Sequence, residues 1–284
     1  AAIMGNSVVM THQRLDFFLL ALDQLVNAAA KTHYMYGGEL ECPITIRLII
    51  GRGWGQGPTH SQNLQSWFAH IPGLKVVMPT FPSDAKWLLE ESIQDPNPVI
   101  FLEHRWLHNT VNPREIDLSQ RVRIGKSRVC KEGSDATIVS SGLLTLEALK
   151  AAKYLRDKHS INVEIIDLVS MKPIDYDTIG KSVIKTGKIV AIDSGHKTCS
   201  IASEIIASIT INYFNKLDAA PRRISMADCP EPTSFALTRE FNIRAHNIAK
   251  EVLNMFNIDD INVEGTLPEP EKHDVPGEWF NGPF

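Results

Sequence analysis

The feature that most constrains this 284-residue sequence is a short apolar run that leads into a glycine-rich loop. The run PITIRLII, residues 43–50, is rich in β-branched residues and predicts a buried strand. The loop after it carries one histidine, His60, and four glycines, Gly51, Gly53, Gly55 and Gly57. Because glycine has no Cβ, this backbone can turn sharply and approach a ligand closely. The loop is therefore a candidate site at the end of a strand.

Alternating helices and strands continue from the loop. We expect helices at residues 63–70 and 83–93, and strands at residues 75–78 and 98–103. This order predicts a parallel sheet whose ligands lie at the carboxyl ends of its strands.

Two elements are expected before the loop. Residues 6–10 predict a short strand. Residues 17–34 have apolar side chains on most faces and predict one long buried helix, ended by Gly37 and Gly38. The sequence begins at Ala1 with neither an initiating Met nor a signal-peptide layout, so we expect it to start inside a domain.

A second alternation begins at about residue 136 and predicts a second α/β domain. The fold class expected is therefore α/β, with two doubly wound domains. The boundaries we expect are residues 1–122 for the first domain, 123–260 for the second and 261–284 for a tail. The tail is either a mobile end or an arm laid on a partner surface, and its aromatic residues Trp279, Phe280 and Phe284 favour the arm.

Composition excludes several classes of protein. A net charge of −4 and the absence of basic runs argue against nucleic acid as a partner. No apolar run is long enough to span a membrane. The four widely spaced cysteines fit reduced thiols better than a disulfide framework. We therefore expect a cytoplasmic protein, or one of the mitochondrial matrix in a eukaryote.

Two aromatic side chains are candidate site residues. His60 belongs either to an ordinary glycine-rich connection or to a site where it moves a proton or holds an anion. The loop has neither the dinucleotide fingerprint GxGxxG nor the phosphate loop GxxxxGK[ST]. Phe17, at a helix start, suits core packing or stacking on a flat heteroaromatic ring.

Other polar segments are weaker candidates. Residues 92–97, SIQDPN, fit either a polar turn or a cation site made of helix-end carbonyls and side-chain oxygens. His196 and Cys199 lack a third orienting group, so we do not expect a nucleophile there. No GDG motif is followed by a distant Asn, so a diphosphate with Mg²⁺ would have to be held by another chain.

The run from His60 to His104, beginning HSQNLQSWFAHIPGLKVVMP, resembles the beta subunit of the thiamine-diphosphate-dependent first component of 2-oxo acid dehydrogenase complexes, within the transketolase-like family. The segments FFLLALDQLVNAAAKTHYMYGG, SVIKTGKIVAIDSG and ADCPEPTSFALTREFNI extend the resemblance over nearly the whole chain. The resemblance implies a transketolase pyrimidine-binding domain, truncated at its N-terminus, followed by a transketolase C-terminal domain.

The resemblance also implies roles for individual residues. Phe17 matches the aromatic residue that packs on the aminopyrimidine ring, and His60 matches the active-site histidine that holds the substrate carboxylate or assists acyl transfer. The family's Glu that hydrogen-bonds the pyrimidine is expected upstream of Ala1. Positions that bind a structural K⁺ in some members match Ile44, Ser92, Ile93, Asp95 and Asn97.

The activity implied is oxidative decarboxylation of a 2-oxo acid with acyl transfer to a lipoyl group. Thiamine diphosphate would be the cofactor, and an alpha-type partner subunit would hold most of the Mg²⁺ coordination. Some members of the family also bind K⁺, so K⁺ is a further candidate cofactor. A self-dimer, a two-alpha two-beta assembly and a lipoyl-bearing acyltransferase are further implied partners. Two alternatives stay open: a ketol-transferring subunit, since GPTH also resembles transketolases, and a non-catalytic dimerisation module, since the upstream Glu is missing here.

Overall fold

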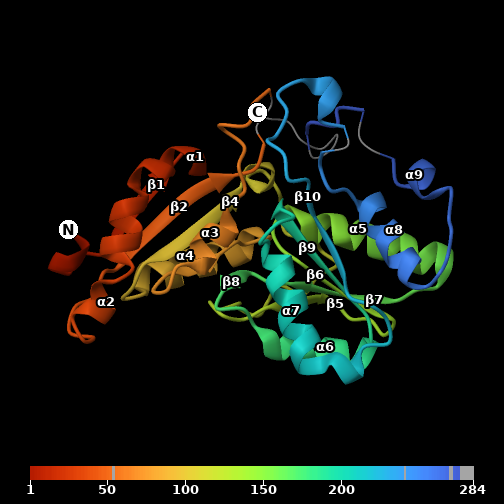
Figure 1. The fold of residues 1–284 in the computed structure, drawn as a ribbon, viewed down its shortest axis with the longest axis horizontal. Helices are drawn as coiled ribbons and strands as arrows, with labels where there is room; N and C mark the ends of the chain where they lie inside the picture. The colour runs from red at the N-terminus through yellow and green to blue at the C-terminus, as the bar shows by residue number, and fades with distance from the viewer. Residues whose placement is uncertain (53–54, 240, 269–270, 276–284) are drawn as a thin grey trace.

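Two α/β halves lie side by side in the computed structural model, which describes residues 1–52, 55–239, 241–268 and 271–275 (Figure 1). The first half occupies the left of the view and the second half the right. Each half contains a five-stranded sheet in which four strands are parallel and one edge strand is antiparallel. This arrangement confirms the predicted pair of α/β domains.

The first sheet has the strand order β1-β2-β4-β3-β8. Strands β1 and β2 are parallel neighbours, with Val8 opposite Ile44, so their carboxyl ends meet at one edge of the sheet. The strands are β1 (Val8–His12), β2 (Ile44–Ile50), β4 (Val99–His104), β3 (Lys75–Val77) and the antiparallel β8 (Ser170–Lys172).

Helices cover both faces of the first sheet because side chains alternate along β4. Ile100 and Leu102 share a core with Phe18 and Phe68, which belong to α1 (Leu15–Phe18) and α3 (Gln65–His70). Phe101, between them, points to the other face and packs in a separate core with the helix α4 (Pro82–Gln94). The sheet is therefore doubly wound, as predicted.

The second sheet has the order β10-β9-β6-β7-β5. Helices α5 and α8 cover one face and α6 and α7 the other (Figure 1). The strands are β10 (Arg222–Met226), β9 (Ile189–His196), β6 (Ala136–Ser140), β7 (Val163–Asp167) and the antiparallel β5 (Arg128–Lys131). The helices are α5 (Leu143–His159), α6 (Tyr176–Thr186), α7 (Ile201–Tyr213) and α8 (Ala245–Met255), with a short α9 (Val263–Thr266) after them.

The two halves share one hydrophobic core. Buried residues of α1 and α3 belong to the same cluster as Ile179 of α6 and Ile205 of α7. Strand β8 of the second half completes the first sheet, and the Lys172 Nζ donates hydrogen bonds to the carbonyls of Ala69 and Ile71. Neither antiparallel edge strand was predicted, because each has only three or four residues and no apolar run.

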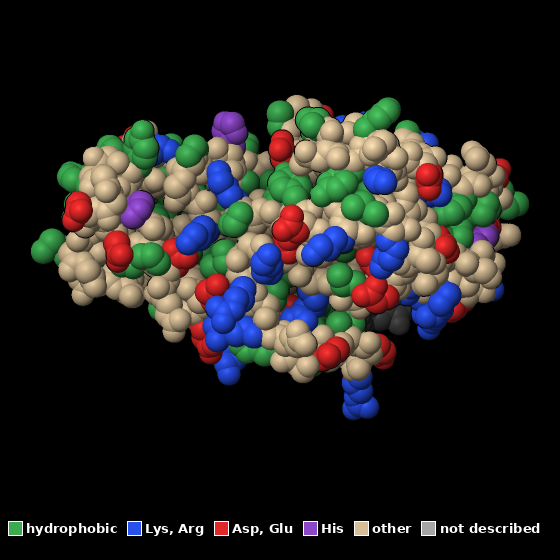
Figure 2. Space-filling model, turned by 90° about the horizontal axis from the view of Figure 1, so that it is seen from below, with side chains coloured by type: hydrophobic (Ala, Val, Ile, Leu, Met, Phe, Trp, Pro, Cys, Tyr) green, Lys and Arg blue, Asp and Glu red, His purple; other side chains and the backbone are tan. Residues whose placement is uncertain are grey.

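The prediction of one long buried helix at residues 17–34 is wrong. The segment is divided into α1, a 3₁₀ turn at Leu19–Ala21, a π-helical stretch at Gln24–Ala29 and α2 (Thr32–Met35). The wide turn accompanies a close backbone approach, since a Cβ on Gly73 would lie 1.9 Å from the carbonyl oxygen of Ala30. Much of the segment is also exposed, with Leu20 at 92% and Tyr34 at 88%. Figure 2 shows hydrophobic side chains at this left-hand end of the molecule.

The start of the predicted tail packs on the chain's own second half. His273 is buried and stacks on Phe235, with 3.9 Å between ring centroids. The Arg244 Nη2 donates hydrogen bonds to the carbonyls of His273 and Val275. The aromatic residues on which the arm was predicted, Trp279, Phe280 and Phe284, lie outside the described residues. Within the part of the chain that is described, no helix is long and apolar enough to cross a membrane.

Candidate active site

Phe17 and His60 lie against each other, although 43 positions separate them in the sequence. Their ring centroids are 5.3 Å apart and the rings meet edge to face at 86°. Parallel pairing explains this contact, because α1 follows β1 and the glycine-rich loop follows β2, and these two strands end at the same edge. The structure thus brings together the two aromatic residues predicted for the site.

The surroundings of these rings leave room for a ligand. Phe17 is 50% exposed, which is unusual for a large apolar side chain in a core. The Thr59 hydroxyl lies 3.0 Å from His60 Nδ1, so Nε2 is the ring nitrogen that remains for a ligand among the described residues. Asp16 accepts a hydrogen bond of 2.8 Å from the Gln62 side chain and so ties α1 to the loop. An aromatic ring packed on Phe17 would lie beside an imidazole able to exchange a proton.

Arginines hold the glycine-rich loop from two sides. The Arg14 guanidinium donates to the Gly51 carbonyl at 2.8 Å and to the Gln56 side chain. The Arg52 guanidinium donates to the carbonyls of Pro232 and Thr233 in the second half, at 2.5 and 3.2 Å. The loop is therefore fixed both to its own sheet and to the other half of the chain.

A buried ion pair accompanies these bonds. Arg52 Nη1 lies 3.4 Å from Glu231 Oε1, and the two side chains are only 1% and 8% exposed. Burial raises the pKa of the Glu231 carboxyl to about 7, although the Arg52 charge opposes that rise. Burial also lowers the pKa of Arg14 to about 10, with the nearby Arg105 contributing.

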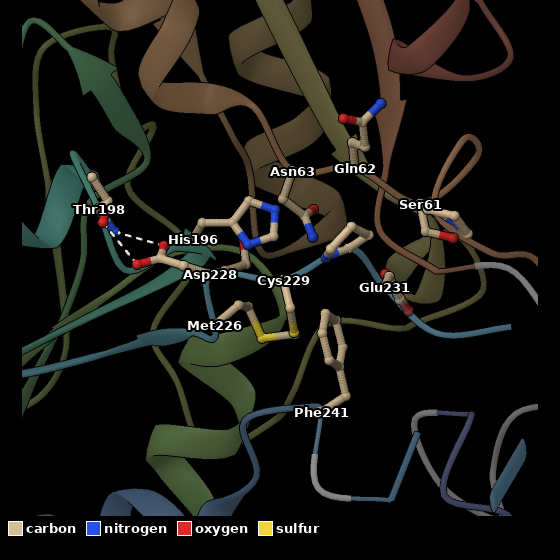
Figure 3. Close-up of a pocket in the computed structure, with 13 residues that line it drawn as sticks. Ser61, Gln62, Asn63, His196, Thr198, Met226, Asp228, Cys229, Glu231 and Phe241 are labelled. Atoms are coloured by element: carbon tan, nitrogen blue, oxygen red, sulfur yellow. Dashed lines mark hydrogen bonds between the residues drawn. The ribbon is translucent and has the colours of Figure 1, made fainter. Parts of the chain in front are cut away.

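A cleft of about 370 Å³ opens between the loop and the second half (Figure 3). Asp228 accepts hydrogen bonds from the backbone N–H and hydroxyl of Thr198, at 3.0 and 2.7 Å, and these bonds lower its pKa. None of the described residues that line the cleft is Lys or Arg. The lining includes Pro58, Ser61, Asp228, Cys229 and Glu231.

The residues expected to bind K⁺ belong to two segments, the start of β2 and the end of α4, which are joined by a hydrogen bond of 3.0 Å from the Cys42 N–H to the Pro96 carbonyl. The carboxylate of Asp95 is already engaged, since Lys75 donates to one oxygen and the backbone N–H of Asn97 lies 3.0 Å from the other. Ser92 is buried and its hydroxyl donates to the Leu88 carbonyl at 2.6 Å. Main-chain oxygens, including those of Ile44 and Ile93, would therefore be important ligands for a cation here, and K⁺ binding stays a prediction.

Among the described residues, no group of three or more His, Cys, Asp or Glu side chains could hold a metal ion. The exposed face of Phe17 fits the ring end of thiamine diphosphate, while the described residues offer no carboxylate cluster for Mg²⁺ at its other end.

The sequence analysis did not predict several residues of the site. Arg14 bonds to residues 37 and 42 positions away, and Arg52 pairs with Glu231 across 179 positions, so no local pattern reveals these contacts. The available signals were an arginine inside the glycine-rich loop and an acidic residue in the DCPEP segment after a strand. Among the described residues, the hydrogen-bond partner of the His196 ring is the carbonyl of Ala227, at 2.8 Å.

Comparison with known families accounts for both halves. Residues 1–110 match the family described as transketolase, pyrimidine binding domain, and residues 125–248 match transketolase, C-terminal domain. A solved structure described as "Split gene transketolase, inactive beta4 tetramer" has the same fold, with a TM-score of 0.73 at 20% identity over 91% of this chain and 79% of that one. The fold and site thus define a transketolase-like protein.

Curated relatives narrow this class. The chain is 41% identical over 234 residues to the pyruvate dehydrogenase E1 component subunit beta of Rhizobium meliloti (strain 1021), covering 82% of this chain and 50% of that protein. It is 38% identical over 242 residues to the mitochondrial pyruvate dehydrogenase E1 component subunit beta-1 of Arabidopsis thaliana, covering 84% and 66%.

A third relative is named for a different substrate, acetoin. The chain is 38% identical over 234 residues to the acetoin:2,6-dichlorophenolindophenol oxidoreductase subunit beta of Cupriavidus necator, covering 82% of this chain and 69% of that protein. The chain belongs to the transketolase-like, thiamine-diphosphate-dependent family of E1 beta subunits of 2-oxo acid dehydrogenases. It spans half to about two thirds of the length of the first two of these relatives.

Proposed function

We propose that this chain works as the beta-type subunit of a thiamine-diphosphate-dependent 2-oxo acid dehydrogenase. The observation that carries the proposal is the contact between the half-exposed Phe17 ring and His60 at the carboxyl ends of β1 and β2. Phe17 packs on the cofactor's pyrimidine, and His60 holds the substrate carboxylate or assists acyl transfer to a lipoyl group. The bound cofactor supplies the carbanion chemistry, while the protein orients it and controls proton transfer.

An alpha-type partner subunit completes the site in this proposal. It holds the diphosphate and most of the Mg²⁺ coordination, which the described residues of this chain do not provide. The exposed apolar residues of the N-terminal end, Leu20 and Tyr34 among them, support a subunit contact there, either in a self-dimer or with the alpha subunit. A lipoyl-bearing acyltransferase, a structural K⁺ and a cytoplasmic or mitochondrial-matrix location belong to the same proposal.

The charge of the cleft supports an uncharged acyl acceptor over a sugar phosphate. Asp228 and Glu231 line the cleft, and its described lining contains neither Lys nor Arg. A phosphorylated acceptor would bring its negative charge against the Asp228 carboxylate, and no Lys or Arg among the described lining residues could pair with it. This favours dehydrogenation over ketol transfer.

The test is a pair of matched histidine variants in the complete assembly of this chain with its alpha-type partner. His60→Ala is expected to lower kcat with pyruvate by about 100-fold, because it removes a proton-transfer group, while thiamine diphosphate affinity stays nearly unchanged. His70→Ala, at the exposed end of α3, is the control and keeps wild-type kcat.

Calorimetric titration of thiamine diphosphate with Mg²⁺ provides the binding measurement. Binding to the mixture but not to this chain alone supports a site shared between subunits. Wild-type turnover in His60→Ala would refute the catalytic role, and absence of binding to the mixture would favour the non-catalytic dimerisation module.

A further inference from the structure

The loop that carries His60 rests on a segment of the second half. Gly57 packs directly on Thr233, since a Cβ added to Gly57 would lie 2.0 Å from the Thr233 hydroxyl oxygen. A larger residue at position 57 would therefore have to move the Thr233 side chain. The backbone of the loop at Gly57 thus packs against the side chain of Thr233 in the second half.

This contact is linked to His60 through the main chain. The backbone N–H of His60 donates a hydrogen bond of 3.1 Å to the carbonyl of Gly57. A shift of Gly57 away from Thr233 would carry the turn with it, and the imidazole would then move relative to Phe17. The position of residues 231–233 thus determines where the His60 ring lies.

The Arg52 guanidinium supplies the attachment that holds these segments together. It reaches Glu231, Pro232 and Thr233, three consecutive residues of the second half. Two of these partners are carbonyls and would remain whatever side chain stands at 231. Among the described residues, Glu231 supplies the carboxyl group that forms an ion pair with Arg52. A buried guanidinium without its counter-charge is costly, so loss of that carboxyl would loosen the attachment.

We infer that Arg52 and Glu231 are positioning residues for the proposed reaction, and that they act by clamping the glycine-rich loop to the second half so that His60 faces the ring on Phe17. Neither side chain needs to touch a substrate for this role. The inference rests on the proposed function for its catalytic part, whereas the clamp itself is a property of the chain.

The first measurement needs no activity. Hydrogen–deuterium exchange of this chain is compared for the wild type, Glu231→Gln and Arg52→Lys in peptides spanning residues 55–62. Glu231→Gln keeps the shape and one acceptor but removes the charge, and Arg52→Lys keeps the charge but removes the planar fork. Both variants are expected to exchange faster in these peptides and at the wild-type rate across α5. Glu39→Gln, which removes an exposed carboxylate before β2, is the control.

The second measurement is a double-mutant cycle in the assembly with the alpha-type partner, using pyruvate. Glu231→Gln is expected to lower kcat about tenfold, with KM and thiamine diphosphate affinity unchanged, because misplacing a reacting group costs rate rather than binding. In a His60→Ala background the same substitution should have no further effect on kcat, since it acts through His60.

Equal losses of kcat in the two backgrounds would overturn the inference, because a merely structural defect is independent of His60. Unchanged exchange in residues 55–62 would overturn it as well. If the wild-type assembly has no activity with any 2-oxo acid, the proposed function fails, and the exchange measurement alone decides whether the clamp exists.

Discussion

Asp167, at the end of β7, is fully buried where the two halves meet. One carboxylate oxygen accepts a hydrogen bond of 3.3 Å from the Thr145 hydroxyl. Burial is the main cause that raises the pKa of this carboxyl to about 7 from 3.8. Near neutral pH the folded protein therefore holds a carboxyl that is close to its titration point.

This pKa makes stability depend on pH in a definite direction. Because the folded state binds the Asp167 proton more tightly than the unfolded state, its contribution to stability is present below about pH 4 and is lost as the pH rises to 7. Asn at this position has no proton to lose. The free energy of unfolding of Asp167→Asn, relative to that of the wild type, should therefore rise between pH 4 and pH 8, by at most about 4 kcal/mol. Urea unfolding at a series of pH values measures this difference.

The matched control is Asp259→Asn, which removes an exposed carboxylate. It should follow the wild-type pH dependence throughout. The prediction fails if Asp167→Asn and the wild type lose stability in parallel between pH 4 and pH 8.

At the same scale, His60 and Phe17 were predictable as candidates because each carries chemistry that its local sequence displays. Their contact was not visible in the sequence, and it follows from the pairing of β1 with β2. Arg52 and Glu231 were missed because the free energy that makes them partners arises only when distant segments exclude water from both.

At the scale of the element, the glycine-rich loop depends on close packing at one position. Gly57→Ala should destabilise the protein by about 1–3 kcal/mol and speed exchange in residues 55–62, because its Cβ would collide with the Thr233 hydroxyl. Adding Thr233→Ala should restore most of the loss, since the nearest remaining atom, the Cβ at 3.2 Å, can give way by a few tenths of an ångström.

Thermal unfolding and exchange of the single and double variants measure this compensation. Gly265→Ala is the control, because a Cβ there meets nothing within 4 Å. If Thr233→Ala fails to relieve Gly57→Ala, then the loop is not held by this contact.

Helices and strands were predictable where the pattern of apolar residues is typical of a single kind of element. The strands β2 and β4 are mostly apolar runs, and α4 follows the helical period, so their positions were close to those expected. Residues 17–34 are apolar on most faces, and such a pattern does not distinguish a buried helix from a broken one with an exposed apolar side. The edge strands β5 and β8 depend on pairing rather than on their own residues.

At the scale of the whole molecule, the shared core predicts that both halves unfold together. Tryptophan fluorescence reports mainly on the first half, which contains Trp67, Trp87 and Trp106, whereas circular dichroism reports on both. The two signals should give one coincident transition. Lys172→Met removes two hydrogen bonds to the first half. It should lower the free energy of unfolding by about 1–3 kcal/mol and move both signals together. Two separated transitions, or a shift in one signal only, would show that the halves are independent.

Strand β8 also has a consequence for how the chain is made. A ribosome releases the N-terminal half first, but the edge of its sheet beside β3 is closed only by residues 170–172. Until those residues have left the exit tunnel, β3 presents an open edge and the apolar surface of α3 lacks its cover from α6 and α7. We therefore expect the first half to complete its packing only when the second half has been synthesised.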